Sequence, residues 1–244
     1  MSTLTAKSER RQSMKDGKGG GTDAPRDILG AIFDQDGLLF DTERIYQECW
    51  LESARLQGVD MDPSFPRRFC GVGRRLIAEM AAAEHPELDI ERFCNKAVEF
   101  AWGRQLAGVP EKKPGLGRML EFCRAHGIRT AVASSSPRNV VEHNLRAAGV
   151  REFFDAVATG DEVENSKPAP DIFLLAAQRI GVAPARCCVF EDAVSGIRGA
   201  NAAGMKAVMI PDLRQPTDEI RAMCTVCRDL GEAIAALSNR NQPF

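Results

Sequence analysis

Short apolar runs recur along the chain, and each is followed by polar residues or by glycine. A strand that is buried on both faces of a parallel sheet has a continuous apolar run rather than an alternating pattern. The pattern therefore predicts a set of buried, parallel strands. These runs occupy residues 28–33, 130–133, 156–158, 187–190 and 207–210.

Helix-length segments lie between several of these runs. Their apolar residues recur at intervals of three and four, which places them on one face of a helix. We predict helices over 116–123, 140–148 and 172–180. Gly149 and Gly181 follow the last two segments, at the position where glycine commonly ends a helix. Strands that alternate with helices are typical of an α/β doubly wound fold around a parallel sheet.

The stretch from 45 to 108 breaks this alternation, because it contains no strand-like run. Its periodicity and its glycine and proline breaks predict helices over 46–57, 74–84 and 89–105. A helical module inserted after the first strand is positioned to cover the carboxyl edge of the sheet, where such folds bind ligands. We therefore predict an α/β core over 27–44 and 109–240 and a helical cap over 45–108.

Charge and length exclude some classes of protein. The 244 residues include 32 Lys and Arg against 34 Asp and Glu, so the net charge is −2. A nucleic-acid-binding domain carries a basic patch, so we expect no nucleic-acid partner. No apolar stretch approaches the roughly 18 residues that span a bilayer, so we expect no membrane partner. Residues 1–26 are polar and predict a disordered tail.

Eight cysteines are scattered over the chain. Secreted proteins that depend on disulfides are shorter and denser in cysteine, so we expect reduced thiols and a cytoplasmic protein. Cys224 and Cys227 have the C-x-x-C spacing of some metal and redox sites, but no histidine has a spacing that would complete a zinc site. Two interpretations stay open: a metal or redox pair, or two half-buried cysteines near a strand.

Two carboxylates, Asp34 and Asp36, directly follow the first apolar run. Side chains two positions apart on an extended chain point the same way, and Gly37 permits a turn that brings both into one site. Neighbouring carboxylates repel each other, so they need a cation or a shared proton. Mg²⁺ suits them, because it takes oxygen ligands and shares them with a substrate phosphate. The alternative is a polar loop that leaves a strand.

Further polar residues follow the later strands. Ser134 and Ser135 follow the second, Lys167 comes after the third, and Glu191 and Asp192 follow the fourth. Each has an ordinary alternative: a helix N-cap, a solvated lysine, or acids that complement a helix dipole. Because the carboxyl ends of parallel strands share one edge, we expect these residues to converge. Carboxylates, a divalent cation, a hydroxyl and a lysine form a set suited to phosphoryl transfer.

Four motifs in this order resemble those of the haloacid dehalogenase superfamily of phosphohydrolases. Residues 33–43, Phe-Asp-Gln-Asp-Gly-Leu-Leu-Phe-Asp-Thr-Glu, resemble the first motif, and Ser134 resembles the second. Lys167 resembles the third, and the Glu-Asp pair at 191–192 the fourth. The resemblance runs from 28 to about 237 and is strongest to the β-phosphoglucomutase-like group with its sugar-phosphate and pseudouridine-5′-phosphate phosphatases. It implies a Rossmann-like core with an inserted helical cap.

The resemblance implies roles for the acidic residues. Asp34 is expected to be the nucleophile that forms an aspartyl-phosphate. Asp36 is expected to protonate the leaving oxygen and then to activate water. Mg²⁺ is expected to be held by Asp34, by the carbonyl of Asp36 and by Asp192, with Glu191 supporting the metal site.

The resemblance also implies a phosphate and substrate site. Ser134 and Lys167 are expected to bind the transferring phosphoryl group, with Ser135 and Thr42 as further candidates for binding phosphate or substrate. Substrate choice would belong to the cap, where Arg74 is the candidate contact. The alternative for Arg74 is a solvated arginine at the start of a helix.

One departure from the resemblance bears on the reaction. The mutase carries a histidine shortly after the Asp-Thr segment, and this chain has Tyr46 there. We therefore expect a Mg²⁺-dependent phosphatase acting on a small phosphorylated metabolite, either a sugar phosphate or a nucleoside-type phosphate. The alternatives are a β-phosphoglucomutase-type mutase and a non-catalytic binding module on the same fold. We expect a monomer or a weak homodimer.

Overall fold

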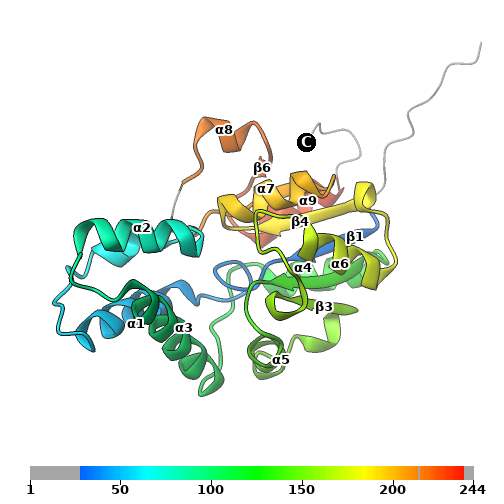
Figure 1. Cartoon of the computed structure of the whole chain (residues 1–244). Coiled ribbons are helices and arrows are strands. Elements are labelled where there is room, and N and C mark those ends of the chain that lie inside the picture. Colours follow the sequence, from blue (N-terminus) through cyan, green and yellow to red (C-terminus); the bar gives the residue numbers. More distant parts are fainter. Residues whose placement is uncertain (1–27, 214, 239–244) are drawn as a thin grey trace, which may run out of the picture.

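A parallel sheet forms the centre of the molecule (Figure 1). The structure is a computed structural model that describes residues 28–213 and 215–238, so the predicted tail over 1–26 lies outside the described residues. The sheet has six strands in the order β3-β2-β1-β4-β5-β6, and every neighbouring pair is parallel. This confirms the doubly wound α/β fold. The strands are β1 (Gly30–Phe33), β2 (Arg129–Ser134), β3 (Ala156–Thr159), β4 (Cys187–Glu191), β5 (Lys206–Met209) and β6 (Thr225–Val226).

Each face of the sheet packs against its own set of helices. Phe33 of β1 belongs to a core shared with α4, α5 and α9, whereas its neighbour Ile32 belongs to a core shared with α6 and α7. Both faces are therefore covered, which explains why the strands have continuous apolar runs. The helices are α4 (Leu116–Ala125), α5 (Arg138–Ala147), α6 (Asp171–Ile180), α7 (Val194–Ala202) and α9 (Leu230–Ser238).

The stretch after β1 is helical and has its own apolar cluster. It contains α1 (Glu43–Arg55), a 3₁₀ turn η1 (Phe65–Phe69), α2 (Arg74–Glu84) and α3 (Ile90–Leu106). We call α1, η1, α2 and α3 the inserted helices. Figure 1 shows α1, α2 and α3 grouped beside the sheet rather than on its faces. Trp50, Phe69 and Phe93 pack against one another in their centre, so the insert has an apolar core of its own.

The ends of these helices differ slightly from the sequence predictions. Helix α1 begins at Glu43 rather than 46 and ends at Arg55 rather than 57. It ends there because Gly58, with φ at +77°, donates from its N–H to the carbonyl of Arg55. This left-handed glycine after the last turn is a common helix terminator.

The C-terminal elements β6 and α9 were not predicted. Strand β6 has two residues, both half-buried, and so gives no apolar run. Helix α9 packs by Leu230 and small alanines, which give a weak periodic signal. The remaining short elements are α8 (Asp218–Arg221), η2 (Arg151–Phe153), η3 (Gly160–Glu162) and η4 (Pro184–Arg186). Within the described residues no helix combines the length and apolar character that a membrane span requires.

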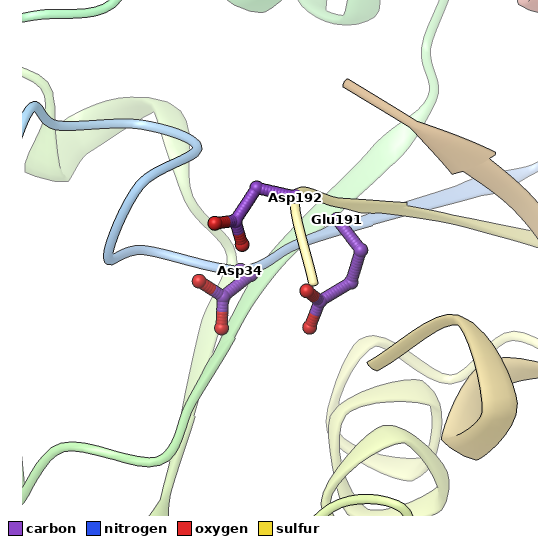
Figure 2. Close-up of side chains that lie close together, drawn as sticks. All are labelled: Asp34, Glu191 and Asp192. Atoms are coloured by element: carbon purple, nitrogen blue, oxygen red, sulfur yellow. The ribbon is translucent and has the colours of Figure 1, made fainter. Parts of the chain in front are cut away.

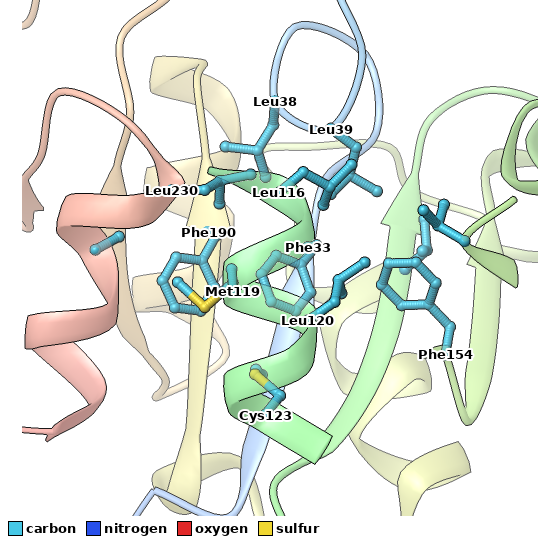
Figure 3. Close-up of a cluster of buried hydrophobic side chains, with 14 of the residues drawn as sticks. Phe33, Leu38, Leu39, Leu116, Met119, Leu120, Cys123, Phe154, Phe190 and Leu230 are labelled. Atoms are coloured by element: carbon cyan, nitrogen blue, oxygen red, sulfur yellow. The ribbon is translucent and has the colours of Figure 1, made fainter. Parts of the chain in front are cut away.

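Phe33 lies at the centre of the core under α4 (Figure 3). Its ring stacks on Phe190 of β4 with centroids 4.8 Å apart and meets Phe154 edge-on at 6.0 Å. Phe33 is fully buried, and the next residue along the chain is Asp34. The packing of this ring therefore fixes the end of β1 from which a candidate site residue projects.

We expect Phe33→Ala to lower the free energy of unfolding by about 3–5 kcal/mol, because it removes a buried ring and leaves a cavity. Urea denaturation measures this loss. Leu174→Ala is the control, since Leu174 on α6 is 41% exposed, and an exposed substitution costs about 0.5 kcal/mol or less. Equal losses in the two variants would contradict the central place of Phe33.

Candidate active site

The register of the sheet brings Asp34 and Glu191 side by side. Strand β1 lies between β2 and β4, and Phe33 is aligned with Val132 on one side and Phe190 on the other. The backbone N–H of Asp34 continues this ladder by donating to the carbonyl of Phe190 at 3.0 Å. The residues that follow β1 and end β4 therefore meet at one edge, as parallel strands require.

Lys167 inserts its ammonium group between these two carboxylates. Its Nζ lies 2.5 Å from Oδ1 of Asp34, 2.6 Å from Oε1 of Glu191 and 3.0 Å from the carbonyl oxygen of Ala133. Only 7% of its side chain is exposed. Burial alone would lower the pKa of Lys167, but the two carboxylates hold it above its usual value. The lysine is therefore a fixed positive charge beside Asp34.

Asp192 joins Asp34 and Glu191 to form an acidic cluster (Figure 2). One carboxylate oxygen from each of the three residues lies within 4.8 Å of the others. Burial raises the pKa of Asp34 and of Asp192, and the charge of Glu191 raises both further. Lys167 opposes these effects, but one ammonium group balances only one of three carboxylates.

The donor set of the acidic cluster fits a divalent cation. Mg²⁺ takes oxygen ligands from one or two carboxylates and keeps positions for water and phosphate. A double positive charge would offset the excess negative charge and lower the raised pKa values of Asp34 and Asp192. Both oxygens of Glu191 are engaged, Oε1 by Lys167 and Oε2 by the backbone N–H of Ala193 at 3.3 Å. Asp34 accepts from Lys167 through Oδ1 alone, so its Oδ2 and the carboxylate of Asp192 are available as ligands.

Two glycines make room for the acidic cluster. A Cβ at Gly37, where φ is +83°, would overlap the carboxylate of Asp192. A Cβ at Gly196, in the first turn of α7, would overlap the carboxylate of Glu191. Each acid therefore lies in a space that only glycine leaves open.

Asp36 belongs to a different set of contacts. Its Oδ1 accepts from the hydroxyl of Thr42 at 2.8 Å, and its Oδ2 accepts from the hydroxyl of Ser136 at 2.9 Å. The hydroxyl of Ser134 lies 3.5 Å from the same Oδ2 and accepts the N–H of Ser136. Ser134, predicted to bind phosphate, and Thr42, predicted to bind phosphate or substrate, thus both contact Asp36, whereas Ser135 is exposed. The sequence did not identify Ser136 as a site residue, and only its position in the run of three serines at 134–136 could have indicated it.

A cavity of about 390 Å³ opens beside the acidic cluster. Asp34, Asp36, Ser135, Lys167 and Asp192 line it from the sheet side. The inserted helices and the loop before α2 line it with mostly aromatic and aliphatic side chains: Tyr46, Trp50, Phe69, Val72, Ile77, Val98 and Trp102. Arg74 also lines it, and its guanidinium donates to Oδ1 of Asn95 at 2.6 Å. The predicted site residues and the insert therefore enclose one space.

The C-x-x-C pair lies away from this cavity. Cys227 packs into the core beside α4 and α9, whereas Cys224 packs against the core on the opposite face of the sheet. All eight cysteines are free thiols. Among the described residues, the acidic cluster is the one group of three or more acids, cysteines or histidines arranged to hold a metal. Cys224 is half-buried as predicted, whereas Cys227 is buried, and β6 lies between them.

Glu43 also lines the cavity, at the first turn of α1. The pKa of Glu43 is raised from 4.5 to about 7, mainly by burial and further by the charges of Asp36 and Asp212. A hydrogen bond from the thiol of Cys70 and the charge of Lys113 oppose this rise. When the pKa of a carboxyl group is higher in the folded chain than in the unfolded chain, the folded chain becomes less stable as the pH rises from the lower pKa to the higher one.

We compare the free energy of unfolding of Glu43→Gln with that of the native chain. We expect the difference, variant minus native, to increase by about 3 kcal/mol from pH 4.5 to pH 7 and then to stay constant. The unfolded chain loses the Glu43 proton near pH 4.5, the folded chain keeps it until about pH 7, and the glutamine variant loses none. Urea denaturation across this pH range measures the difference. Glu79→Gln, on the exposed side of α2, is the control. Parallel curves for Glu43→Gln and the native chain would refute the expectation.

We expect Gly37→Ala to weaken Mg²⁺ binding at least about 10-fold, because the new methyl group displaces the carboxylate of Asp192. Titration calorimetry measures the affinity. The matched control is Gly58→Ala, which has a similar positive φ of +77° but no atom within 4 Å of its Cβ position. Both variants should lose about 1–2 kcal/mol of stability through backbone strain. Equal affinity in both would show that Asp192 does not hold the ion.

Comparison with known proteins agrees with this geometry. A family model described as haloacid dehalogenase-like hydrolase matches residues 28–204. The phosphorylated carbohydrates phosphatase of Thermotoga maritima is 35% identical over 179 residues, covering 72% of this chain and 82% of the relative. The probable pseudouridine-5′-phosphatase of Drosophila melanogaster is 35% identical over 197 residues, covering 78% and 84%.

A solved structure extends the comparison to the fold. CbbY from Rhodobacter sphaeroides, crystallised in complex with phosphate, superposes with a TM-score of 0.71 at 29% identity, covering 87% of this chain and all of that one. The resemblance that the four motifs predicted is therefore confirmed by sequence and by fold. The chain belongs to the haloacid dehalogenase-like hydrolases.

Proposed function

We propose that this protein is a Mg²⁺-dependent phosphatase that works through a phosphoryl-aspartate at Asp34. The observation that carries the proposal is the buried pair of Asp34 and Lys167 at the floor of the cavity. One oxygen of Asp34 is held by Lys167, so the carboxylate keeps a fixed orientation and presents its other oxygen. A carboxylate nucleophile divides one difficult displacement into two easier ones.

In the first step an oxygen of Asp34 attacks phosphorus, and the bond between phosphorus and the leaving oxygen breaks. Asp36, as the acid, gives its proton to that oxygen, so the leaving group departs as a neutral alcohol. In the second step Asp36 accepts a proton from water while the water oxygen attacks phosphorus. The bond from phosphorus to Asp34 then breaks, which restores the carboxylate and frees inorganic phosphate.

The metal would be held by Asp34, Asp192 and the backbone carbonyl of Asp36, with Glu191 holding Lys167 and the loop at Ala193 in place. When bound, Mg²⁺ supplies positive charge that stabilises the phosphoryl oxygens in the transition state. Lys167 supplies a second, permanent positive charge at the same point. The acidic cluster and the Lys167 contact support this assignment.

The proposed substrate is a small phosphorylated sugar or nucleoside-type phosphate. A cavity of about 390 Å³ has room for a leaving group of that size. Its aromatic and aliphatic lining from the inserted helices suits the apolar face of a sugar ring or a base. The relatives named after phosphorylated carbohydrates and pseudouridine-5′-phosphate support the same range. Arg74, at the rim, is the proposed contact for polar groups of the substrate.

Hydrolysis is favoured over mutase chemistry by Tyr46. The resemblance to the mutase group places a histidine at that position; a histidine changes its charge near neutral pH, whereas a tyrosine hydroxyl stays un-ionised there. The cavity-facing location of Tyr46 makes the difference relevant to the reaction. The eight free thiols support a reducing compartment, so we propose the cytoplasm as the place of action.

We expect Asp34→Asn to lower phosphate release from p-nitrophenyl phosphate by more than about 10³-fold, because the amide cannot act as an anionic nucleophile. Asp60→Asn, which changes an exposed carboxylate, is the control and should keep the native rate. Removal of Mg²⁺ with EDTA should abolish the native rate, and added Mg²⁺ should restore it. Native turnover in Asp34→Asn would disprove the mechanism. Interconversion of hexose phosphates without net phosphate release would favour a mutase.

A further inference from the structure

Ser136, in the turn after β2, is held at three of its atoms. Its backbone N–H donates to Oγ of Ser134 at 3.1 Å, and its carbonyl oxygen accepts from the N–H of Gly160 at 3.2 Å. Its hydroxyl donates to Oδ2 of Asp36 at 2.9 Å. Only 4% of the residue is exposed. The two backbone bonds therefore fix the point from which the hydroxyl reaches Asp36.

The turn after β3 lies directly against residues 134–136, which we call the serine turn. Ser134 at the end of β2 is aligned with Thr159 at the end of β3, so the chain leaves both strands at the same edge of the sheet. A Cβ at Gly160 would overlap the carbonyl oxygen of Ser135. The two turns therefore approach so closely that only glycine fits at position 160, and the hydrogen bond from Gly160 to Ser136 depends on this approach.

A cluster of charged hydrogen bonds holds η3, the turn that begins at Gly160. The carboxylate of Glu162 accepts from the N–H and the hydroxyl of Thr159 at 3.0 and 2.8 Å. It also accepts from Arg138 on α5 at 2.6 Å and from Arg179 on α6 at 2.8 and 2.9 Å. The hydrogen bonds from Arg179 hold the pKa of Glu162 well below its usual range, so the carboxylate stays charged. The η3 turn is therefore tied to β3, α5 and α6, which gives Gly160 a fixed place against the serine turn.

The two carboxylate oxygens of Asp36 have different surroundings. Oδ1 accepts from the hydroxyl of Thr42 at 2.8 Å, and Oδ2 accepts from the hydroxyl of Ser136. Within the described part of the chain, Ser136 lines the cavity together with Asp36, whereas Thr42 is fully buried and does not line it. Oδ2 is therefore the oxygen on the cavity side. A carboxyl group that carries a proton can still accept a hydrogen bond, so the Ser136 contact is compatible with both forms of Asp36.

We propose that Ser136 is a positioning residue that aims Oδ2 of Asp36 at the leaving oxygen, and that the η3 turn keeps Ser136 in place. The inference rests on the proposed phosphatase reaction, in which Asp36 transfers protons. A proton donor must lie within hydrogen-bond reach of the atom that receives the proton, and a small misplacement slows the transfer. The phosphoryl group is proposed to bind at Lys167 and the metal. Loss of the Ser136 contact therefore slows proton transfer and leaves phosphate binding unchanged.

The kinetic test compares two esters whose leaving oxygens need the proton of Asp36 to different degrees. p-Nitrophenol is a stronger acid than phenol, so p-nitrophenyl phosphate depends less on that proton than phenyl phosphate does. We expect Ser136→Ala to lower kcat/KM about 10-fold or more for phenyl phosphate and less than about 3-fold for p-nitrophenyl phosphate. The inhibition constant of inorganic phosphate should stay within about 2-fold of native. Equal losses for the two esters, or no loss for either, would overturn the proposal.

Ser53→Ala is the matched control for this variant. Ser53 is fully buried, and its hydroxyl donates to the carbonyl of Phe93 at 2.8 Å, so the substitution removes a similar hydrogen bond inside the inserted helices. It should keep the native kcat/KM for both esters.

A second variant tests the η3 turn without touching Asp36 or its partners. The methyl group of Gly160→Ala would displace the serine turn, so we expect the same larger loss for phenyl phosphate than for p-nitrophenyl phosphate. Gly117→Ala on α4 is the control, since no atom lies within 4 Å of its Cβ position. A native ratio of the two rates in Gly160→Ala would overturn the role of η3.

A crystal structure of Ser136→Ala gives a test that does not depend on turnover. We expect Oδ2 of Asp36 to move by more than about 0.5 Å, which is the tolerance of a productive site, while Asp34 and Lys167 keep their places. An unmoved Asp36 overturns the proposal. If Asp36 moves but the native chain releases no phosphate from either ester, the positioning contact of Ser136 stands and the proposed function fails.

Discussion

The ammonium group of Lys167 between Asp34 and Glu191 is the interaction on which the site depends. All three side chains are at least nine-tenths buried, so each charge lacks the water that would otherwise stabilise it. Removal of one partner from such a set leaves an uncompensated buried charge, which is strongly destabilising. The position of Lys167 therefore depends on the ends of β1 and β4, which carry Asp34 and Glu191. It also depends on Gly196, which leaves room for the carboxylate of Glu191. With Asp192 the cluster has three carboxylates against one ammonium group, and this excess negative charge suits it to a divalent cation.

The edge of the sheet supplies the two carboxylates of this arrangement, since Glu191 ends β4 and Asp34 directly follows β1, whereas Lys167 reaches them from the loop before α6. The three central strands β2, β1 and β4 place their ends in one row, and the stacked rings of Phe33 and Phe190 lie directly beneath it. Side chains that project from a packed sheet edge are held more firmly than those on free loops. The inserted helices have an apolar core of their own, so they can vary the wall of the cavity without disturbing that row.

The acidic residues could be predicted from the sequence because their positions follow from local rules. A continuous apolar run predicts a parallel strand, and the end of such a strand predicts a shared edge, which places Asp34 and Glu191 together. The partners of Asp36 could not be predicted in this way. The hydrogen bond from Thr42, a candidate for binding phosphate or substrate, to Asp36 follows from no local sequence rule, and Ser136 reaches Asp36 only because of the turn after β2. Tyr46 was noted for its departure from a family pattern, but its neighbours on α3 depend on how separate helices pack.

The two aspartates of the first motif end in environments of different kinds. Asp34 is surrounded by charges, from Lys167 and the acidic cluster, whereas Asp36 contacts neutral hydroxyl groups. In the proposed reaction the surroundings of each aspartate suit its role. A nucleophile must stay ionised, which a fixed ammonium group favours, while a proton donor must gain and lose a proton, which rotatable hydroxyls accommodate.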